Sequence, residues 1–91
     1  MSSVNSYRDF ALLQGDQAAL PVLIQLLRDP SLQVRLVAAD GLQRLGCEAE
    51  PAVATLLTLY DDPEGLVRRK VRLTLPFIDA DAAAHADRRG R

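Results

Sequence analysis

The chain has 91 residues, of which 48% are hydrophobic, 11 are Lys or Arg and 12 are Asp or Glu, so its net charge at pH 7 is −1. This length allows one domain, and this hydrophobic content excludes an intrinsically disordered chain. A net charge so close to zero disfavours proteins whose main ligand is nucleic acid, since these usually carry a large basic surplus. Aromatic residues make up only 4% and Trp is absent, so the core must be aliphatic, which favours helices over a sheet.

Cysteine use and the terminal residues indicate the compartment. Cys47 is the single cysteine, so no internal disulfide can form, as is typical of a reducing compartment. Residues 1–6 show no basic and apolar leader, and no apolar run approaches the length that spans a bilayer. We therefore expect a cytoplasmic protein that does not enter a membrane.

The hydrophobic periodicity predicts five helices. In chain order they cover residues 4–14, 17–28, 31–45, 50–61 and 64–78. An Asp-Pro pair ends the second and the fourth helix, because the residue before a proline is forced out of the helical region. Ser31 is a suitable N-cap for the third helix, and Gly46 is a suitable C-cap. Pro76 should end or kink the fifth helix, and the Ala-, Asp- and Arg-rich segment after it indicates a frayed helix or a flexible tail.

The middle of the chain repeats itself with a period of 33 residues, since residues 16–45 align with residues 49–78 without a gap. Eight aligned pairs are identical: Ala19 and Ala52, Leu23 and Leu56, Leu26 and Leu59, Asp29 and Asp62, Pro30 and Pro63, Val34 and Val67, Arg35 and Arg68, and Leu42 and Leu75. Two amphipathic helices alike by chance would not also share Asp-Pro and Val-Arg. Each repeat is therefore predicted to be a helical hairpin. The second helix of the first repeat should point Val34, Ala38, Leu42 and Leu45 into the core. The second helix of the second repeat should do the same with Val67, Val71, Leu75 and Ile78.

The segment from Leu26 to Gly46, LLRDPSLQVRLVAADGLQRLG, resembles the short bacterial HEAT-like repeats, including those of phycobilisome-lyase type. The second copy, residues 56–78, keeps Asp-Pro and Val-Arg but replaces alanines by Val71 and Arg72, and the final Leu-Gly by Phe-Ile. The resemblance implies an all-α fold, a short right-handed α-solenoid of about five helices in a single domain. The parts are a capping helix at 4–15, repeat 1 at 16–46, repeat 2 at 47–78 and a flexible tail at 79–91. A cap is expected because each solenoid repeat exposes an apolar face to its neighbour. The resemblance also implies that four residues form a structural ladder of polar contacts between the repeats: Asp29, Arg35, Asp62 and Arg68.

No catalytic constellation is visible in the sequence. His85 is the single histidine and has no Cys or His at ligand spacing, so we expect a solvated tail residue. Cys47 has no base nearby in the sequence, which favours a buried or half-buried loop thiol over a nucleophile. Some HEAT-like hydroxylases bind iron through His-Glu pairs, and this sequence has none. We therefore predict no enzyme activity, no metal and no cofactor.

The helical wheel indicates a second, outward face on the repeats. This face holds more large apolar residues than a solvated surface normally does, and clustered apolar residues mark interaction sites more often than scattered ones. In HEAT-like proteins the second helix of each repeat lines the groove where partners bind. The candidate partner-binding residues are Leu36, Asp40, Arg44, Leu66, Arg69, Leu73 and Phe77. The alternative is that the tail or a second copy of the chain covers this face.

The sequence thus predicts a non-catalytic adaptor, or an assembly or maturation factor, that binds a protein partner. One alternative is an accessory subunit that, like the bilin-lyase HEAT proteins, helps to attach or detach a chromophore. Another is a nucleic-acid-binding HEAT-like protein, which the run Arg68-Arg69-Lys70 would favour. The overall charge and the scarcity of aromatics disfavour it, and an acidic protein partner fits the basic run better. A homodimer through the C-terminal repeat also stays open, because identical chains usually meet about a two-fold axis.

Overall fold

The computed structural model describes residues 19–89, and this part of the chain contains helices and no strand. The helices are α2 (Leu20–Leu26), α3 (Leu32–Leu45), α4 (Val53–Thr58), α5 (Gly65–Ile78) and α6 (Ala80–Arg89), with 3₁₀ segments η2 (Gly46–Ala52) and η3 (Leu59–Asp61). The all-α prediction is therefore confirmed for these residues. The predicted capping helix at 4–14 lies outside the described residues.

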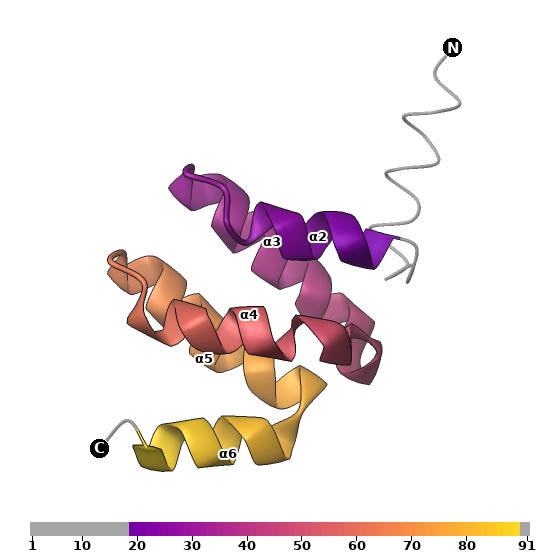
Figure 1. The fold of residues 1–91 in the computed structure, drawn as a ribbon, viewed down its shortest axis with the longest axis vertical. Helices are drawn as coiled ribbons and strands as arrows, with labels where there is room; N and C mark the ends of the chain where they lie inside the picture. Colours follow the sequence, from indigo (N-terminus) through magenta and orange to yellow (C-terminus); the bar gives the residue numbers. More distant parts are fainter. Residues whose placement is uncertain (1–18, 90–91) are drawn as a thin grey trace.

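The helices form two layers (Figure 1). Helices α2, α4 and α6 lie one below another in the front layer, and α3 and α5 lie behind them. Consecutive helices alternate between the layers, so α2 with α3 and α4 with α5 make two hairpins, the two repeats. Helix α3 packs along α5, and α6 packs against α5. The two hairpins are thus joined mainly through their second helices.

The boundaries of α3 follow from local chemistry. Ser31 has an extended backbone, and its hydroxyl accepts a hydrogen bond from the amide of Val34 at 3.4 Å, as an N-cap does. The carboxylate of Asp29 accepts from the Ser31 amide at 2.9 Å and holds the turn before it. At the other end Gly46 adopts φ 61° and ψ −138°, a conformation open almost only to glycine. The predicted caps at both ends are therefore confirmed.

The predicted helix at 50–61 is present, but its two ends are tighter than an α-helix. Segment η2 runs directly into α4, and α4 runs into η3. Pro51 lies within η2, where its ring fits the turn and its missing amide removes one possible helical hydrogen bond. Cys47 also lies in η2 and is exposed, so the prediction of a buried or half-buried loop thiol is wrong.

Pro76 does not end α5, which continues to Ile78. Pro76 lies in the last turn, and its exposed position allows water to reach the carbonyl that lacks an amide partner. The proline removes one helical hydrogen bond, the one that an amide at this position would donate to the carbonyl of Arg72. Of the two outcomes expected at Pro76, an end or a kink, the end is not observed, and the helix runs to residue 78 as predicted.

The segment predicted as a flexible tail contains α6. The carboxylate of Asp79 accepts a hydrogen bond from the amide of Ala82 at 3.0 Å and begins the helix. Alanine is the best helix former, so this composition supports a helix once one side is packed. Ala83 supplies that side, since it is 4% exposed within the core cluster.

The core is aliphatic and centres on the predicted inward positions. The largest side chains with almost no exposure are Leu27, Leu42, Leu56, Leu75, Val67, Val71 and Thr74. Leu42 and Leu75 occupy the same position in the two repeats, which shows that the repeat pattern reflects packing. No helix among the described residues is long and apolar enough to cross a membrane.

Candidate protein-binding surface

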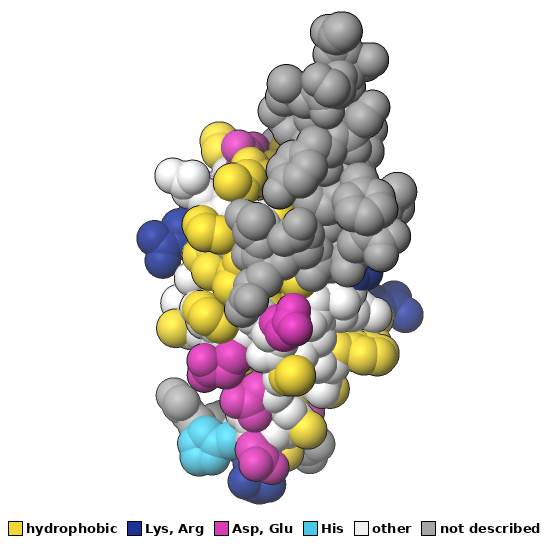
Figure 2. Space-filling view, turned by 90° about the vertical axis from the view of Figure 1, so that its right-hand side faces the viewer, with side chains coloured by type: hydrophobic (Ala, Val, Ile, Leu, Met, Phe, Trp, Pro, Cys, Tyr) yellow, Lys and Arg dark blue, Asp and Glu magenta, His cyan; other side chains and the backbone are white. Residues whose placement is uncertain are grey.

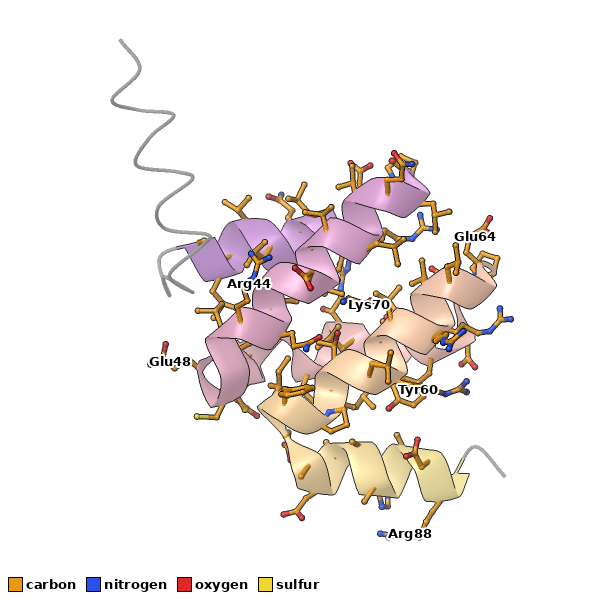
Figure 3. The ribbon with its side chains drawn as sticks, turned by 180° about the vertical axis from the view of Figure 1, so that it is seen from behind. Arg44, Glu48, Tyr60, Glu64, Lys70 and Arg88 are labelled. Carbon is orange, nitrogen blue, oxygen red and sulfur yellow. The ribbon has the colours of Figure 1, made fainter. Side chains whose placement is uncertain are left out.

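The outward side of the back layer carries most of the exposed large apolar side chains. Leu66, Leu73 and Phe77 on α5 are 59%, 58% and 61% exposed, and Val37 on α3 is 65% exposed. Among the described residues only one further large apolar side chain, Val22 on α2, is comparably exposed. We call the outward surface of α3 and α5 the α3/α5 face; Figure 3 views it directly.

Helix α5 places its three exposed apolar residues in one line. Leu66, Leu73 and Phe77 are spaced by seven and four residues, so they lie along one side of the helix. The buried residues of α5, including Val71 and Leu75, lie on the opposite side and join the core. The line is therefore not part of the core packing. We call these three residues the apolar stripe.

Helix α3 contributes a more polar line to the same face. The carboxylate of Asp40 accepts hydrogen bonds from Arg44 at 2.8 Å and from Lys70 of α5 at 3.1 Å. Lys70 reaches across from α5 towards α3 (Figure 3). Leu36 is partly buried against the core and differs in this from the exposed leucines of α5. The structure thus brings Asp40 and Arg44 together in a bridge between the repeats.

Helix α5 is strongly basic. It carries four cations and no carboxylate. Arg68 donates to the main-chain carbonyl of Asp62 at 2.6 Å, and Lys70 holds the bridge to α3. Arg72 stacks over the Tyr60 ring, 5.2 Å from its centroid. Arg69 is exposed, and no ion pair involves it within residues 19–89.

Acidic side chains gather on a different side of the molecule. Figure 2 looks onto the side where η2 lies and shows several acidic side chains there. Glu48 and Glu50 of η2 are both exposed. Figure 2 also shows the histidine at the surface of the α6 end, and His85 is exposed. The exposed carboxylates of η2 thus lie on a different side from the basic helix α5.

Asp29, Arg35, Asp62 and Arg68 were expected to link the repeats, and all four lie at the two Asp-Pro turns. Of these four, only the side chain of Arg35 reaches from one repeat to the other. Arg35 donates to the carboxylate of Asp62 in the next repeat at 3.3 Å, with side-chain exposures of 11% and 8%. The same guanidinium donates to the carbonyls of Asp29 at 2.8 Å and Pro30 at 3.1 Å. Arg68 instead bonds within its own repeat. Arg35 and Asp62 thus link the repeats, and the other two hold the turns.

Tyr60 occupies a site that the sequence did not single out, beside α5 on the side of α6 (Figure 3). Its hydroxyl oxygen is buried and has no hydrogen-bond partner within residues 19–89. Burial raises the pKa of Tyr60 above its ordinary 10.0, the charge of Asp87 raises this pKa further, and Arg72 lowers it. The hydroxyl is a weak candidate for chemistry, because its raised pKa keeps it protonated at neutral pH.

Val37 was not among the residues expected on this face, and Lys70 was expected only as part of the basic run 68–70. Both fall in the same sector of the helical wheel as the chosen residues, so the signal was present. Within the described residues, no group of three or more His, Cys, Asp or Glu side chains could hold a metal ion. The α3/α5 face can offer apolar contact and positive charge, and it lacks a nucleophile paired with a base.

The comparison with known families identifies the class of protein. A family model of HEAT repeats matches residues 7–76, so the chain belongs to the HEAT repeat family. The resemblance seen in the sequence is confirmed. HEAT repeats are commonly protein-interaction modules and are generally non-catalytic. Searches of curated proteins and of solved structures found no match.

Proposed function

We propose that this protein is a short right-handed solenoid that binds another protein through the α3/α5 face, as an adaptor or as an assembly or maturation factor. The observation that carries the proposal is the concentration of exposed apolar side chains on this face. Three of them form the apolar stripe of α5, and Val37 adds a fourth on α3. Such a patch on a small domain costs solubility unless a partner covers it.

The seven partner-binding candidates from the sequence contribute unequally to this proposal. The apolar stripe would supply the contact area, and Arg69 and Arg44 would supply charge at its edges. Asp40 would hold the cations in place, because it already accepts from two of them. Leu36 would mainly support the core.

The proposal is tested by affinity capture from the native host with the full chain as bait. Leu73→Glu places a charge in the apolar stripe, and Val22→Glu is the matched control, since the two residues are 58% and 56% exposed. Both variants should stay folded, because neither residue lies in the core. We expect Leu73→Glu to lose a stoichiometric protein partner that Val22→Glu retains.

The results separate the proposal from its alternatives. A partner captured equally by both variants would refute binding through this face. Light scattering that shows a wild-type dimer abolished by Leu73→Glu would instead assign the face to a homodimer. Bilin absorbance that shifts on mixing with the protein would favour the chromophore-accessory alternative.

A further inference from the structure

On the basis of the proposed function, we infer that the α3/α5 face receives an amphipathic helix of its protein partner whose apolar side is bordered by Asp and Glu on both edges. The apolar stripe runs from Leu66 to Phe77, a length of about 16 Å along α5. This length matches three turns of a bound helix, whose anchors recur at three- and four-residue spacing. The length and straightness of the stripe therefore favour a helix as the occupant.

The charges beside the apolar stripe indicate the charge of the partner residues that would lie next to them. Lys70 lies along the edge that faces α3, since it reaches Asp40 there. Arg69 and Arg72 lie along the other edge, where Arg72 stacks on Tyr60. The stripe is thus bordered by cations on both sides; Asp40 of α3 pairs with Lys70 on one edge, and α5 itself contains no carboxylate. A partner helix with basic or neutral edges would leave these charges unmatched on binding.

The bridge between the repeats has more positive than negative charge. Asp40 is a single carboxylate that serves two cations, Arg44 and Lys70. The three groups together keep a charge of about +1, and Arg44 remains half-exposed. A second carboxylate that approaches beside Leu73 would pair with this excess charge. Charge-assisted bonds of this kind fix the orientation of a docked helix.

Two other occupants fit the face less well. A two-fold dimer through the stripe would bring the cations that border it in one chain close to those of the other, and like charges repel across an interface. Helix α6 of a second copy carries acidic residues, but its apolar residues are all alanine. Nucleic acid would pair with the cations and leave the three large apolar side chains without contact, and only Phe77 could stack on a base.

The inference is tested by selection from a random library of phage-displayed peptides of about 16 residues, long enough for a helix of about 24 Å. The full chain is the target, and the selected peptides are then titrated by fluorescence anisotropy. We expect enriched peptides with large apolar residues at helical spacing and Asp or Glu on both sides of them. Leu73→Ser should weaken their binding at least tenfold, as loss of a central anchor does, while Val22→Ser should leave binding unchanged.

A second pair of variants tests the charges. Arg69→Gln should weaken the selected peptides about fivefold, and the loss should shrink as salt is raised, because exposed charges are screened. Arg28→Gln, at an exposed position outside the α3/α5 face, is the control and should have no effect. Substitution of the peptide's own Asp and Glu by Asn and Gln should reproduce the loss.

The possible failures are distinguishable. Peptides that need Leu73 but carry no acidic bias would overturn this inference and leave the protein-binding face intact. Failure to enrich any peptide that depends on Leu73 would overturn this inference, whereas the protein-binding face itself is refuted only by a captured partner that Leu73→Glu retains. Duplex DNA that binds the wild type and is lost in Arg69→Gln would assign the cations to nucleic acid and refute the acidic helix. A dimer that dissociates in Leu73→Ser would assign the stripe to a second copy.

Discussion

The link between the two repeats yields the sharpest stability prediction. Arg35→Ala removes the one guanidinium that reaches from the first Asp-Pro turn to Asp62 of the second, across a 3.3 Å contact between groups of 11% and 8% exposure. Removal of one member of a buried ion pair costs about 3–5 kcal/mol, because the remaining charge is left uncompensated. We expect the low end, about 3 kcal/mol, because the carboxylate of Asp62 still accepts from the amide of Glu64 at 2.9 Å.

The matched control is Arg68→Ala. Arg68 occupies the same position in the second repeat, but it donates only to the Asp62 carbonyl of its own turn. Loss of one such hydrogen bond should cost about 1 kcal/mol. A domain of this size has a total stability of about 5–10 kcal/mol. Arg35→Ala should therefore remove a large part of it and lower Tm by roughly 10–20 °C.

Urea unfolding followed by circular dichroism at 222 nm measures these differences. A double-mutant cycle with Asp62→Ala isolates the contact between the repeats. Asp62→Ala also removes the hydrogen bond from the Glu64 amide, but this loss occurs with and without Arg35 and therefore cancels. We expect a coupling free energy of about 1–2 kcal/mol between Arg35 and Asp62. A coupling near zero, or equal losses in Arg35→Ala and Arg68→Ala, would show that the crossing contact does not hold the repeats together.

Three further predictions concern packing, backbone and ionisation. Leu75→Ala should cost about 2–5 kcal/mol because this side chain is 0% exposed. Leu73→Ala should change stability by less than about 0.5 kcal/mol. Equal unfolding midpoints for the two variants would contradict this assignment of the inward and outward sides of α5. Gly46→Ala should cost about 1–3 kcal/mol because its φ of 61° is strained for alanine. Gly65→Ala, at the exposed start of α5, should be neutral or stabilising. A lower Tm for Gly65→Ala than for Gly46→Ala would contradict this. Absorbance at 295 nm, taken as wild type minus Tyr60→Phe, should titrate with a midpoint above 10.0, because burial and then Asp87 raise this pKa. The stability due to this raised pKa should be full below pH 10 and should fall as pH rises through the folded pKa, so a Tyr60 midpoint at or below 10 would refute this account.

Much of the fold follows from the sequence alone, because it depends on local chemistry. Both Asp-Pro pairs lie in the turn before the second helix of a repeat, because the residue before a proline is disfavoured in the helical region, and Ser31 caps the next helix through its own hydroxyl. The inward positions Leu42 and Leu75 follow from helical periodicity, which does not depend on the partner helix. The α5 stripe of Leu66 and Leu73 was predictable for the same reason, since the two lie opposite the buried positions.

Contacts between residues far apart in sequence were decided only by the tertiary structure. Lys70 meets Asp40 because α5 packs along α3 at one particular register, and the wheel of α5 alone gives no information on that register. Leu36 and Val37 are neighbours of similar hydrophobicity, but Leu36 packs against the core and is partly buried, while Val37 stays exposed. Helical periodicity can place a residue on a face, but it cannot say what the face meets.

Helix α6 shows the same division at the end of the chain. Its sequence has no large apolar residue, so periodicity offers no core-facing pattern and predicts a tail. Alanine stabilises a helix by intrinsic propensity, and its small side chain contributes burial only when a neighbour lies very close. Helix α5 supplies that neighbour and leaves Ala83 4% exposed. The sequence determined the helices and their inward sides through interactions within a few residues, while the stacking of the helices decided which outward residues meet, which stay exposed and where the charges gather.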